Sequence, residues 1–272
     1  MQRELNAAEL RGLIEDTVRS AALNHAGSTR YREPVTGYAD AADPRWKDLG
    51  DGPIPGHLLP TDLLPQARSV VCFFLPFDKG IVAANARAPL CADEWAASYT
   101  ETNALLAAIC EDLQRRLAAV GVGAAFQQPT HNYDPATLRA RWSHKSAAAI
   151  AGVGRFGLNH LLITERGCAG RISSIVVDSA VHDTRSARGE GGGEEPYCGF
   201  LAGERCNTCI RLCPASAISG EGLDKSKCND HCRRVGKYLN TERGFPGSLA
   251  ICGKCATGPC AFRPFSGRPR SA

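Results

Sequence analysis

Residues 206–218 read CNTCIRLCPASAI, and this run indicates how the C-terminal part of the chain folds. Its three cysteines and the proline after them have the spacing Cys-x2-Cys-x3-Cys-Pro. Bacterial ferredoxins hold iron–sulfur clusters with the run Cys-x2-Cys-x2-Cys-x3-Cys-Pro, whose last cysteine ligates the other cluster of a pair. The first cysteine of that run is missing from its usual position here. We therefore expect Cys198 to supply this ligand across an enlarged loop.

A second group of cysteines follows, with Cys228 and Cys232 and then the spacing Cys-x2-Cys-x4-Cys at residues 252–260. The ferredoxin pattern is distorted here, because the last step is longer and the proline precedes the final cysteine. Two clusters need four thiolates each, and nine cysteines lie between residues 198 and 260. Cys232 is the spare one or exchanges roles with Cys228. The sequence predicts one [4Fe–4S] cluster on Cys198, Cys206, Cys209 and Cys260 and a second on Cys213, Cys228, Cys252 and Cys255.

Zinc is the main alternative for these cysteines, because two zinc sites with four thiolates each would also use Cys-x2-Cys pairs. The triplet followed by proline favours clusters, since zinc ribbons usually present paired knuckles. A disulfide framework is disfavoured by the expected compartment. Residues 1–23 are charged and lack the apolar segment of a secretory signal, and no apolar run approaches the roughly 20 residues that span a bilayer. We expect a cytoplasmic protein with no membrane contact, where disulfides are rare.

Composition adds few constraints on partners. The chain has 272 residues, of which 43% are hydrophobic and 22% charged, as in ordinary soluble globular proteins. The net charge of +4 gives no reason to expect a nucleic-acid partner. Four cysteines lie outside the dense region. Cys72 and Cys110 fit buried apolar positions, whereas Cys168, in a glycine-flanked loop, has no evident role.

Hydrophobic periodicity predicts an α/β core followed by the cysteine module. Residues 188–196 are rich in glycine and charge, and all the dense cysteines come after them, so we place a domain boundary near residue 195. The core would comprise residues 1–195, and the module with a short basic tail residues 196–272. We expect helices at 5–23, 93–120 and 135–151, strands at 69–77, 124–127, 160–164 and 171–178, and an ordered loop at 28–68.

A glycine-rich turn follows the third predicted helix. Gly152, Gly154 and Gly157 match the dinucleotide fingerprint GxGxxG, but that fingerprint needs a strand before the glycines and a helix after them. The order is reversed here. The turn is therefore either a helix stop or a backbone cradle for another cofactor. His144 and Lys145, just upstream, fit either a solvated helix face or a site for an anionic or planar ligand.

The block WSHKSAAAIAGVGRFGLNHLLITERGCAGRISSIVVD at 142–178, followed by the cysteine run at 206–218, resembles epoxyqueuosine reductase and its shorter uncharacterised relatives. Those proteins have a turn Ala-Gly-Leu-Gly-x-x-Gly-x-Asn and a strand Leu-Leu-Ile-Thr, matched by residues 151–159 and 161–164. The resemblance implies an α/β (α+β) fold, with a nitroreductase-like core that binds cobalamin and a ferredoxin-like module with two [4Fe–4S] clusters. The residues expected at the cofactor site are His144, Gly152, Gly154, Gly157 and Asn159.

This chain departs from that family at three points. The family has an Asp-Tyr-His run whose Asp is the proposed proton donor, and the best match, at residues 98–100, reads Ser-Tyr-Thr and has no acid. The lysine of the family's Gly-Lys-Asn is Leu158 here. The helical-repeat extension that engages tRNA has no counterpart after the cysteines. We therefore expect chemistry other than queuosine formation on tRNA.

The sequence favours a 4Fe–4S-dependent reductase. Electrons would come from a donor such as ferredoxin or flavodoxin, pass through two clusters, and reach a corrinoid or small substrate bound by the core. The alternatives are a non-catalytic electron carrier, a redox sensor, and a partner protein that reduces a corrinoid. The choice between Cys228 and Cys232 and the role of Cys168 stay open at this point.

Overall fold

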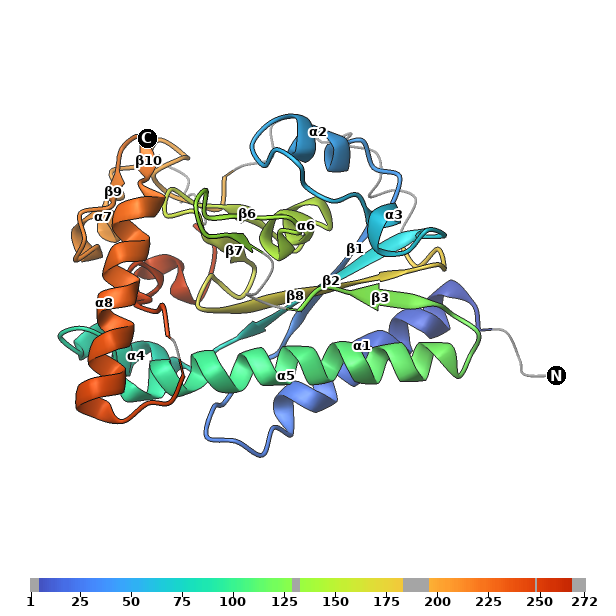
Figure 1. The fold of residues 1–272 in the computed structure, drawn as a ribbon, viewed down its shortest axis with the longest axis horizontal. Coiled ribbons are helices and arrows are strands. Elements are labelled where there is room, and N and C mark those ends of the chain that lie inside the picture. Colours follow the sequence, from blue (N-terminus) through green and yellow to red (C-terminus); the bar gives the residue numbers. More distant parts are fainter. Residues whose placement is uncertain (1–4, 129–132, 183–195, 248, 266–272) are drawn as a thin grey trace, which may run out of the picture.

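The fold is built around an antiparallel sheet (Figure 1). The computed structural model describes residues 5–128, 133–182, 196–247 and 249–265. Four strands pair in the order β1 (Val35–Asp40), β2 (Ser69–Pro76), β8 (Gly170–Val177) and β3 (Ala124–Phe126). Three of these strands match the predicted ones. Together with the helices around them they form a mixed α/β fold of the α+β class.

Strand β2 is buried along its whole length because both faces of the sheet are covered. Val71, Phe73 and Leu75 face a core that includes α1 and α5. Phe74 and its alternate neighbours in β2 face a second apolar cluster, with Trp46 and α6. This two-sided burial explains why the strand is a continuous apolar run rather than an alternating one.

Two long helices lie along one face of the sheet (Figure 1). They are α1 (Ala7–Leu23), which begins at a capping box of Asn6 and Glu9, and α5 (Asp93–Ala118). Both were predicted. Glu101 of α5 accepts hydrogen bonds from the Ser28 hydroxyl at 2.6 Å and the Thr29 amide at 2.8 Å. These bonds attach the loop after α1 to the middle of α5.

The predicted loop at 28–68 is wrong, because it contains β1, α2 (Arg45–Asp51) and α3 (Pro60–Leu63). Most residues of β1 are only half-buried, and α2 and α3 are short, so none of the three carries a strong period. Helix α4 (Lys79–Arg87) was also missed. It begins at Asp78, whose carboxylate accepts a bond from the Gly80 amide at 2.7 Å.

The predicted helix at 135–151 is mostly wrong, since only α6 (His144–Ile150) forms. The residues before it make a hairpin of β4 (Tyr133–Asp134) and β5 (Arg139–Ala140). Asp134 accepts bonds from Ala136 and Thr137, and this turn chemistry competes with a helix. Ser143 then caps α6, and Trp142 stacks on Trp46 with ring centroids 5.5 Å apart.

The glycine turn leads into a second hairpin, β6 (Gly154–Phe156) and β7 (Leu162–Thr164). A strand was predicted at 160–164, and the observed strand begins two residues later, at Leu162. His160 has a φ of 55° and belongs to the turn before it. A Cβ at Gly154 would lie 2.3 Å from the carbonyl oxygen of Ile163. Glycine at this position is required by the close pairing of the two strands.

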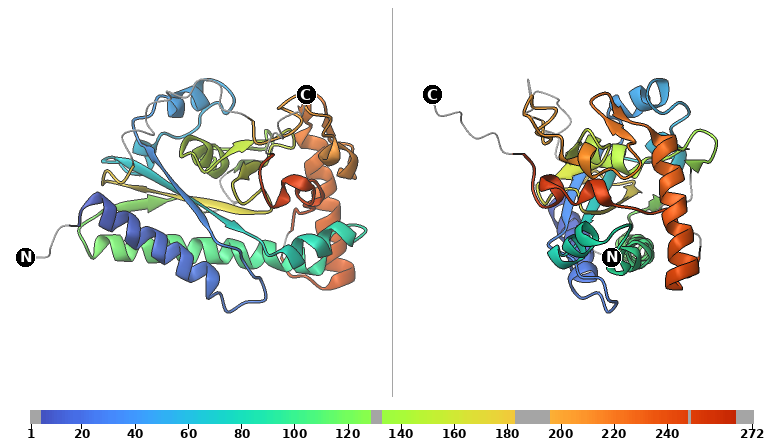
Figure 2. Two further views of the ribbon diagram at one scale, coloured as in Figure 1. Left: turned by 180° about the vertical axis from the view of Figure 1, so that it is seen from behind. Right: turned by 90° about the vertical axis from the view of Figure 1, so that its left-hand side faces the viewer.

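The cysteine-rich part lies at one end of the sheet, where α8 runs across the end of α5 (Figures 1 and 2). The predicted boundary near residue 195 falls at the edge of 183–195, outside the described residues, and stays a prediction. Ile218 and Leu239 pack in the same apolar cluster as Leu106 of α5. The elements of this part are α7 (Thr208–Leu212), β9 (Ile218–Ser219), β10 (Gly222–Leu223), α8 (Lys225–Arg243), η1 (Lys254–Ala256) and η2 (Pro259–Ala261).

No helix in the described ranges combines the length and the apolar composition needed to cross a bilayer.

Candidate metal centre and adjoining cavity

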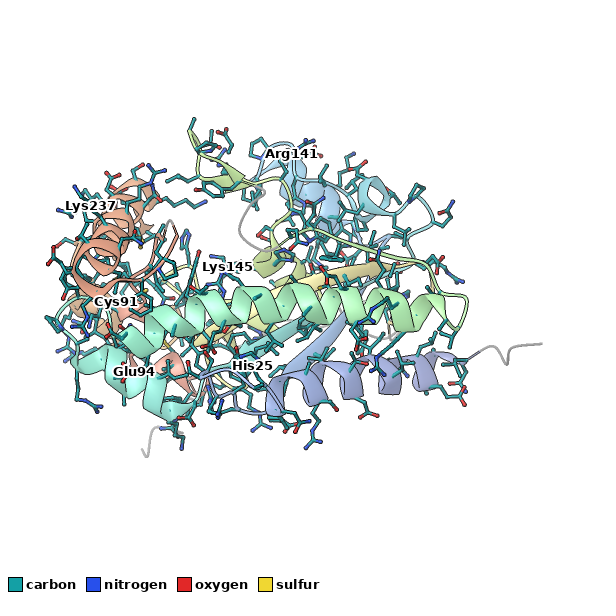
Figure 3. All side chains as sticks on the ribbon, turned by 60° about the horizontal axis from the view of Figure 1, so that its bottom comes forward. His25, Cys91, Glu94, Arg141, Lys145 and Lys237 are labelled. Atoms are coloured by element: carbon teal, nitrogen blue, oxygen red, sulfur yellow. The ribbon has the colours of Figure 1, made fainter. Side chains whose placement is uncertain are left out.

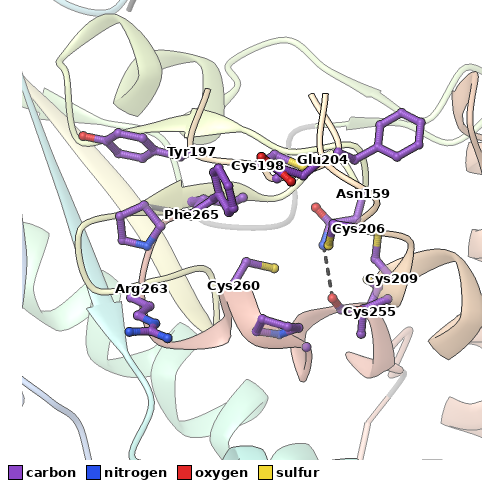
Figure 4. A pocket seen from close by; sticks show the side chains of 17 residues that line it. Asn159, Tyr197, Cys198, Glu204, Cys206, Cys209, Cys255, Cys260, Arg263 and Phe265 are labelled. Carbon is purple, nitrogen blue, oxygen red and sulfur yellow. Dashed lines mark hydrogen bonds between the residues drawn. The ribbon is translucent and has the colours of Figure 1, made fainter. Parts of the chain in front are cut away.

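Four cysteines that the sequence assigns to one cluster line a common cavity of about 730 Å³ (Figure 4). We call it the thiol cavity; Cys198, Cys206, Cys209 and Cys260 border it, and so do Asn159 and Cys255, the latter assigned by the sequence to the other cluster. Burial, followed by the charges of the other three thiols, raises the pKa of Cys209 to about 11. Thiols that repel one another's ionised forms in this way are ready to share a cationic metal centre. The structure thus brings this set together, while its role as a ligand set stays a prediction.

The remaining dense cysteines form a second group around the start of α8 and η1. Burial, and then the charges of Cys228, Cys252 and Cys213, raise the pKa of Cys255. Cys228 and Cys232, one turn apart on α8, hydrogen-bond to each other. That bond lowers the pKa of Cys228 to about 7, against the effect of burial and with help from the charge of Lys145. The charges of Cys252 and Cys255 act on Cys232 as well, so both cysteines of the pair lie near other thiols of this group, and the choice of ligand between them stays a prediction.

Four thiolates can hold either one zinc ion or one iron–sulfur cluster. The first group of cysteines borders an open space inside the protein. The choice between the two kinds of metal centre stays a prediction.

The α/β core holds the last cysteine motif by its backbone. In the motif Cys-x2-Cys-x4-Cys at residues 252–260, the backbone carbonyl of each cysteine accepts a hydrogen bond from a buried residue of the core. Sequence analysis assigned none of these contacts, although Asn159 was expected at a cofactor site. The three bonds are Asn85 Nδ2 to Cys252 O at 3.0 Å, Asn159 Nδ2 to Cys255 O at 3.1 Å, and Cys168 N to Cys260 O at 2.9 Å.

The glycines expected at the cofactor site lie where the backbone turns or packs closely. Gly152 takes a φ of 73° where α6 ends, and it borders a surface groove together with Glu15 and Glu33. A Cβ at Gly157 would lie 3.0 Å from the Asn159 side chain. The structure does not bring these glycines and His144 together around one cavity. The turn forms a helix stop and a hairpin, and its predicted role at a cofactor site stays a prediction.

His144 lies at a second cavity, of about 360 Å³, which we call the cationic cavity. Lys145 and Arg171 line it beside His144, and Lys145, the second residue of α6, is labelled in Figure 3. The Lys145 ammonium donates to the His160 carbonyl at 2.9 Å, and the residue is exposed. The other lining residues are Phe74, Tyr133, Ala140, Trp142, Ser143, Leu161, Leu162, Cys168, Gly170 and Ile172.

A short polar chain fixes the imidazole of His144. The Trp142 indole donates to the Ser174 hydroxyl at 2.9 Å, and that hydroxyl lies 2.8 Å from His144 Nδ1. The hydroxyl keeps one donor and one further acceptor site, so the tautomer of His144 decides which of the two groups donates in this bond. Burial, and then the charge of Arg171, lower the pKa of His144 to about 4. His144 is consequently a neutral group at physiological pH.

Cys168 joins the two cavities. Its side chain lines the cationic cavity, and its sulfur lies 3.7 Å from the sulfur of Cys260, which lines the thiol cavity. Cys168 is only 4% exposed, so this contact is made inside the protein. A centre ligated by Cys260 would therefore stand one residue away from whatever occupies the cationic cavity.

The cationic cavity does not fit a corrinoid, the cofactor that the sequence resemblance implies. A corrinoid is a macrocycle with amide side chains and a nucleotide tail. It is much larger than the drug-sized ligands that occupy cavities of about 300–1,000 Å³. At about 360 Å³, the cationic cavity is at the lower end of that range. It suits a small molecule, and we assign no step to cobalamin.

Comparisons with known proteins show which solved structures share this fold. No protein-family model and no curated protein sequence matches the chain. Among solved structures, epoxyqueuosine reductase with a tRNA-Tyr epoxyqueuosine-modified stem loop superposes with a TM-score of 0.57 and 17% identity, over 96% of this chain and 68% of that one. The chain has the fold of epoxyqueuosine reductase.

Two further structures agree. Selenomethionine-labelled epoxyqueuosine reductase gives a TM-score of 0.55 at 15% identity, and the Bacillus subtilis enzyme gives 0.54 at 15%. They cover 96% and 97% of this chain, which spans 68% of each. The resemblance predicted from residues 142–178 and 206–218 is therefore confirmed in the fold, as is the α+β class.

Proposed function

We propose that this protein is an iron–sulfur oxidoreductase that passes low-potential electrons through two [4Fe–4S] clusters to a small molecule in the cationic cavity. The observation that carries the proposal is the position of Cys168, which lines that cavity and contacts Cys260 of the thiol cavity. The fold, shared with proteins described as epoxyqueuosine reductases, supports a reductase.

The first cluster in this proposal is held by the four cysteines of the thiol cavity. The second is held by Cys213, Cys252, Cys255 and one of the pair on α8. We favour Cys228 as the fourth ligand, because its bond from Cys232 and the nearby charge of Lys145 stabilise its thiolate. A bound [4Fe–4S] cluster supplies one-electron chemistry at low potential.

The residues around these thiols would set the potentials. The Cys168 thiol can donate to the Cys260 sulfur, and hydrogen bonds to ligand sulfurs and burial are the levers by which a protein tunes a cluster. The hydrogen bonds from Asn85 and Asn159 hold the last cysteine motif against the core. In this proposal a carrier protein such as ferredoxin or flavodoxin supplies the electrons from outside.

Reductive titration of protein purified without oxygen tests the proposal. The wild type should show paramagnetic signals from two clusters when it is reduced with dithionite and followed by electron paramagnetic resonance. Cys206→Ser should remove one set of signals and Cys252→Ser the other. A protein with no reducible centre would refute the proposal. Two reducible clusters that no small molecule reoxidises would point to the electron-carrier alternative instead.

A further inference from the structure

The charges around the cationic cavity are unbalanced. Lys145 and Arg171 line it, and none of its lining residues in the described ranges is an aspartate or glutamate. Neither cation makes an ion pair with an acidic side chain among the residues that the structure describes. The Arg171 guanidinium is buried without a carboxylate partner in the described part of the chain, which is unfavourable, so an anion that enters this space gains chiefly from its charge. Lys145 is exposed and also lies near the Cys228 thiol, and it adds a second, weaker attraction.

Arg171 is held in place without being neutralised. Its guanidinium carbon lies 4.2 Å from the centroid of the Tyr99 ring, and its buried Nε atom has no hydrogen-bond partner among the residues that the structure describes. Stacking on an aromatic ring fixes the plane of a guanidinium while leaving its charge intact. An orphaned N–H on a fixed guanidinium is suited to a planar carboxylate, which accepts bonds in that plane.

The rest of the cavity is apolar and includes aromatic rings. Phe74 and Trp142 line it, together with Leu162 and Ile172. A purely inorganic anion would leave this surface in contact with water, whereas an organic acid would cover it. A volume of about 360 Å³ leaves room for a body of about one ring.

We infer that the cationic cavity binds a small organic acid, with its carboxylate between Lys145 and Arg171 and its apolar body against Phe74 and Trp142. This inference names the substrate class of the proposed function and rests on it. The neutral His144 imidazole completes the polar wall without adding a third charge. Cys168, on the same wall, places the acid beside the thiol cavity.

Calorimetric titration of the cluster-loaded protein tests this inference, with benzoate as the probe. Benzamide has the same ring and no charge, so it measures the contribution of the carboxylate. Lys145→Met removes one cation at an exposed side chain, and Lys237→Met on the surface of α8 is the matched control. We expect benzamide to bind at least 10-fold more weakly than benzoate, and Lys145→Met to weaken benzoate roughly 10-fold while Lys237→Met leaves it unchanged.

Equal affinities for benzoate and benzamide, or an unchanged benzoate affinity in Lys145→Met, would overturn the inference. Iron content is measured on each variant, so a lost cluster is not mistaken for a lost ligand site. The failure of the proposed function looks different, because a protein without reducible clusters could still bind benzoate. Intact clusters with no benzoate binding would overturn the inference and leave the electron-transfer proposal in place.

Discussion

Replacing Gly253 with alanine is a sharp test of how the core shapes the second thiol site. Gly253 lies between the cysteines of Cys252-x2-Cys255 and has a φ of 73°, in the left-handed region. A Cβ there would lie 2.2 Å from the ring of Trp95. That ring cannot easily withdraw, because Trp95 is buried and packs edge-on against Phe77 at 5.3 Å. The substitution must therefore displace the cysteine loop or the indole.

The magnitude has two parts. Holding alanine in the left-handed region costs about 1–2 kcal/mol, and overpacking a filled interior costs about 1–3 kcal/mol. Together they predict a loss of about 2–5 kcal/mol in the free energy of unfolding. In a chain of this size each kcal/mol shifts the unfolding temperature by about 2–4 °C. The displaced loop should also lower iron occupancy at the second site.

Gly244→Ala is the matched control. Gly244 has a similar φ of 71° at the end of α8, but nothing lies within 4 Å of the position its Cβ would take. It should show only the backbone part of the loss. Differential scanning calorimetry at one scan rate, with an iron assay on the same samples, compares the two variants. If Gly253→Ala unfolds at the same temperature as Gly244→Ala and keeps its iron, the contact with Trp95 does not position the loop.

Three further predictions follow from named contacts. Cys209→Ser should lose about four iron atoms per chain, whereas Cys110→Ala, at a buried thiol of α5, should keep them. Asn159→Ala removes the donor to a cysteine carbonyl and should lower the free energy of unfolding in urea by about 1–3 kcal/mol. Burial alone would raise the pKa of Glu101, but hydrogen bonds from residues 28–29 lower it to about 2. Its stabilisation is therefore present above the ordinary value of 4.5 and lost as the pH falls toward 2, so Glu101→Gln should cost about 1–2 kcal/mol at pH 7 and less below pH 4.5.

Each of these three predictions would be contradicted by one specific result. Full iron in Cys209→Ser would remove this cysteine from the ligand set. An unfolding midpoint of Asn159→Ala equal to that of the wild type would mean that the bond to the cysteine loop adds no stability. A Glu101→Gln deficit that is constant from pH 7 to pH 4 would show that its hydrogen bonds do not depend on the charge.

The parts of the fold that were predicted from sequence are those with long apolar signals. Strand β2 and helix α5 are buried over many residues, so their periods are clear. Strand β1 is only partly buried, and its pairing partner β2 lies about 30 residues away, so its own sequence gave little sign of it. The false helix at 135–151 arose because Asp134 favours a turn that apolar periodicity does not register.

The candidate site was likewise predicted only in part. The gathering of Cys198, Cys206, Cys209 and Cys260 at one cavity agrees with the predicted set, although Cys255 lines that cavity too and the ligand sets stay a prediction. The cationic cavity does not follow from local spacing, because it is made from α6 and β8, and Arg171 carries no motif. The contacts of Asn85 with Cys252 and of Cys168 with Cys260 join residues 167 and 92 positions apart. Such pairs become visible only when the tertiary structure brings them together.

The most direct test of the central claim is the content of iron, acid-labile sulfide, zinc and cobalt in protein purified without oxygen. The account predicts about eight iron and eight sulfide per chain, with no cobalt bound after cobalamin is offered. About one cobalt per chain would mean that the core binds a corrinoid, and it would refute the assignment of the cationic cavity to a small molecule. Zinc at the cysteines, without sulfide, would contradict the iron–sulfur assignment itself.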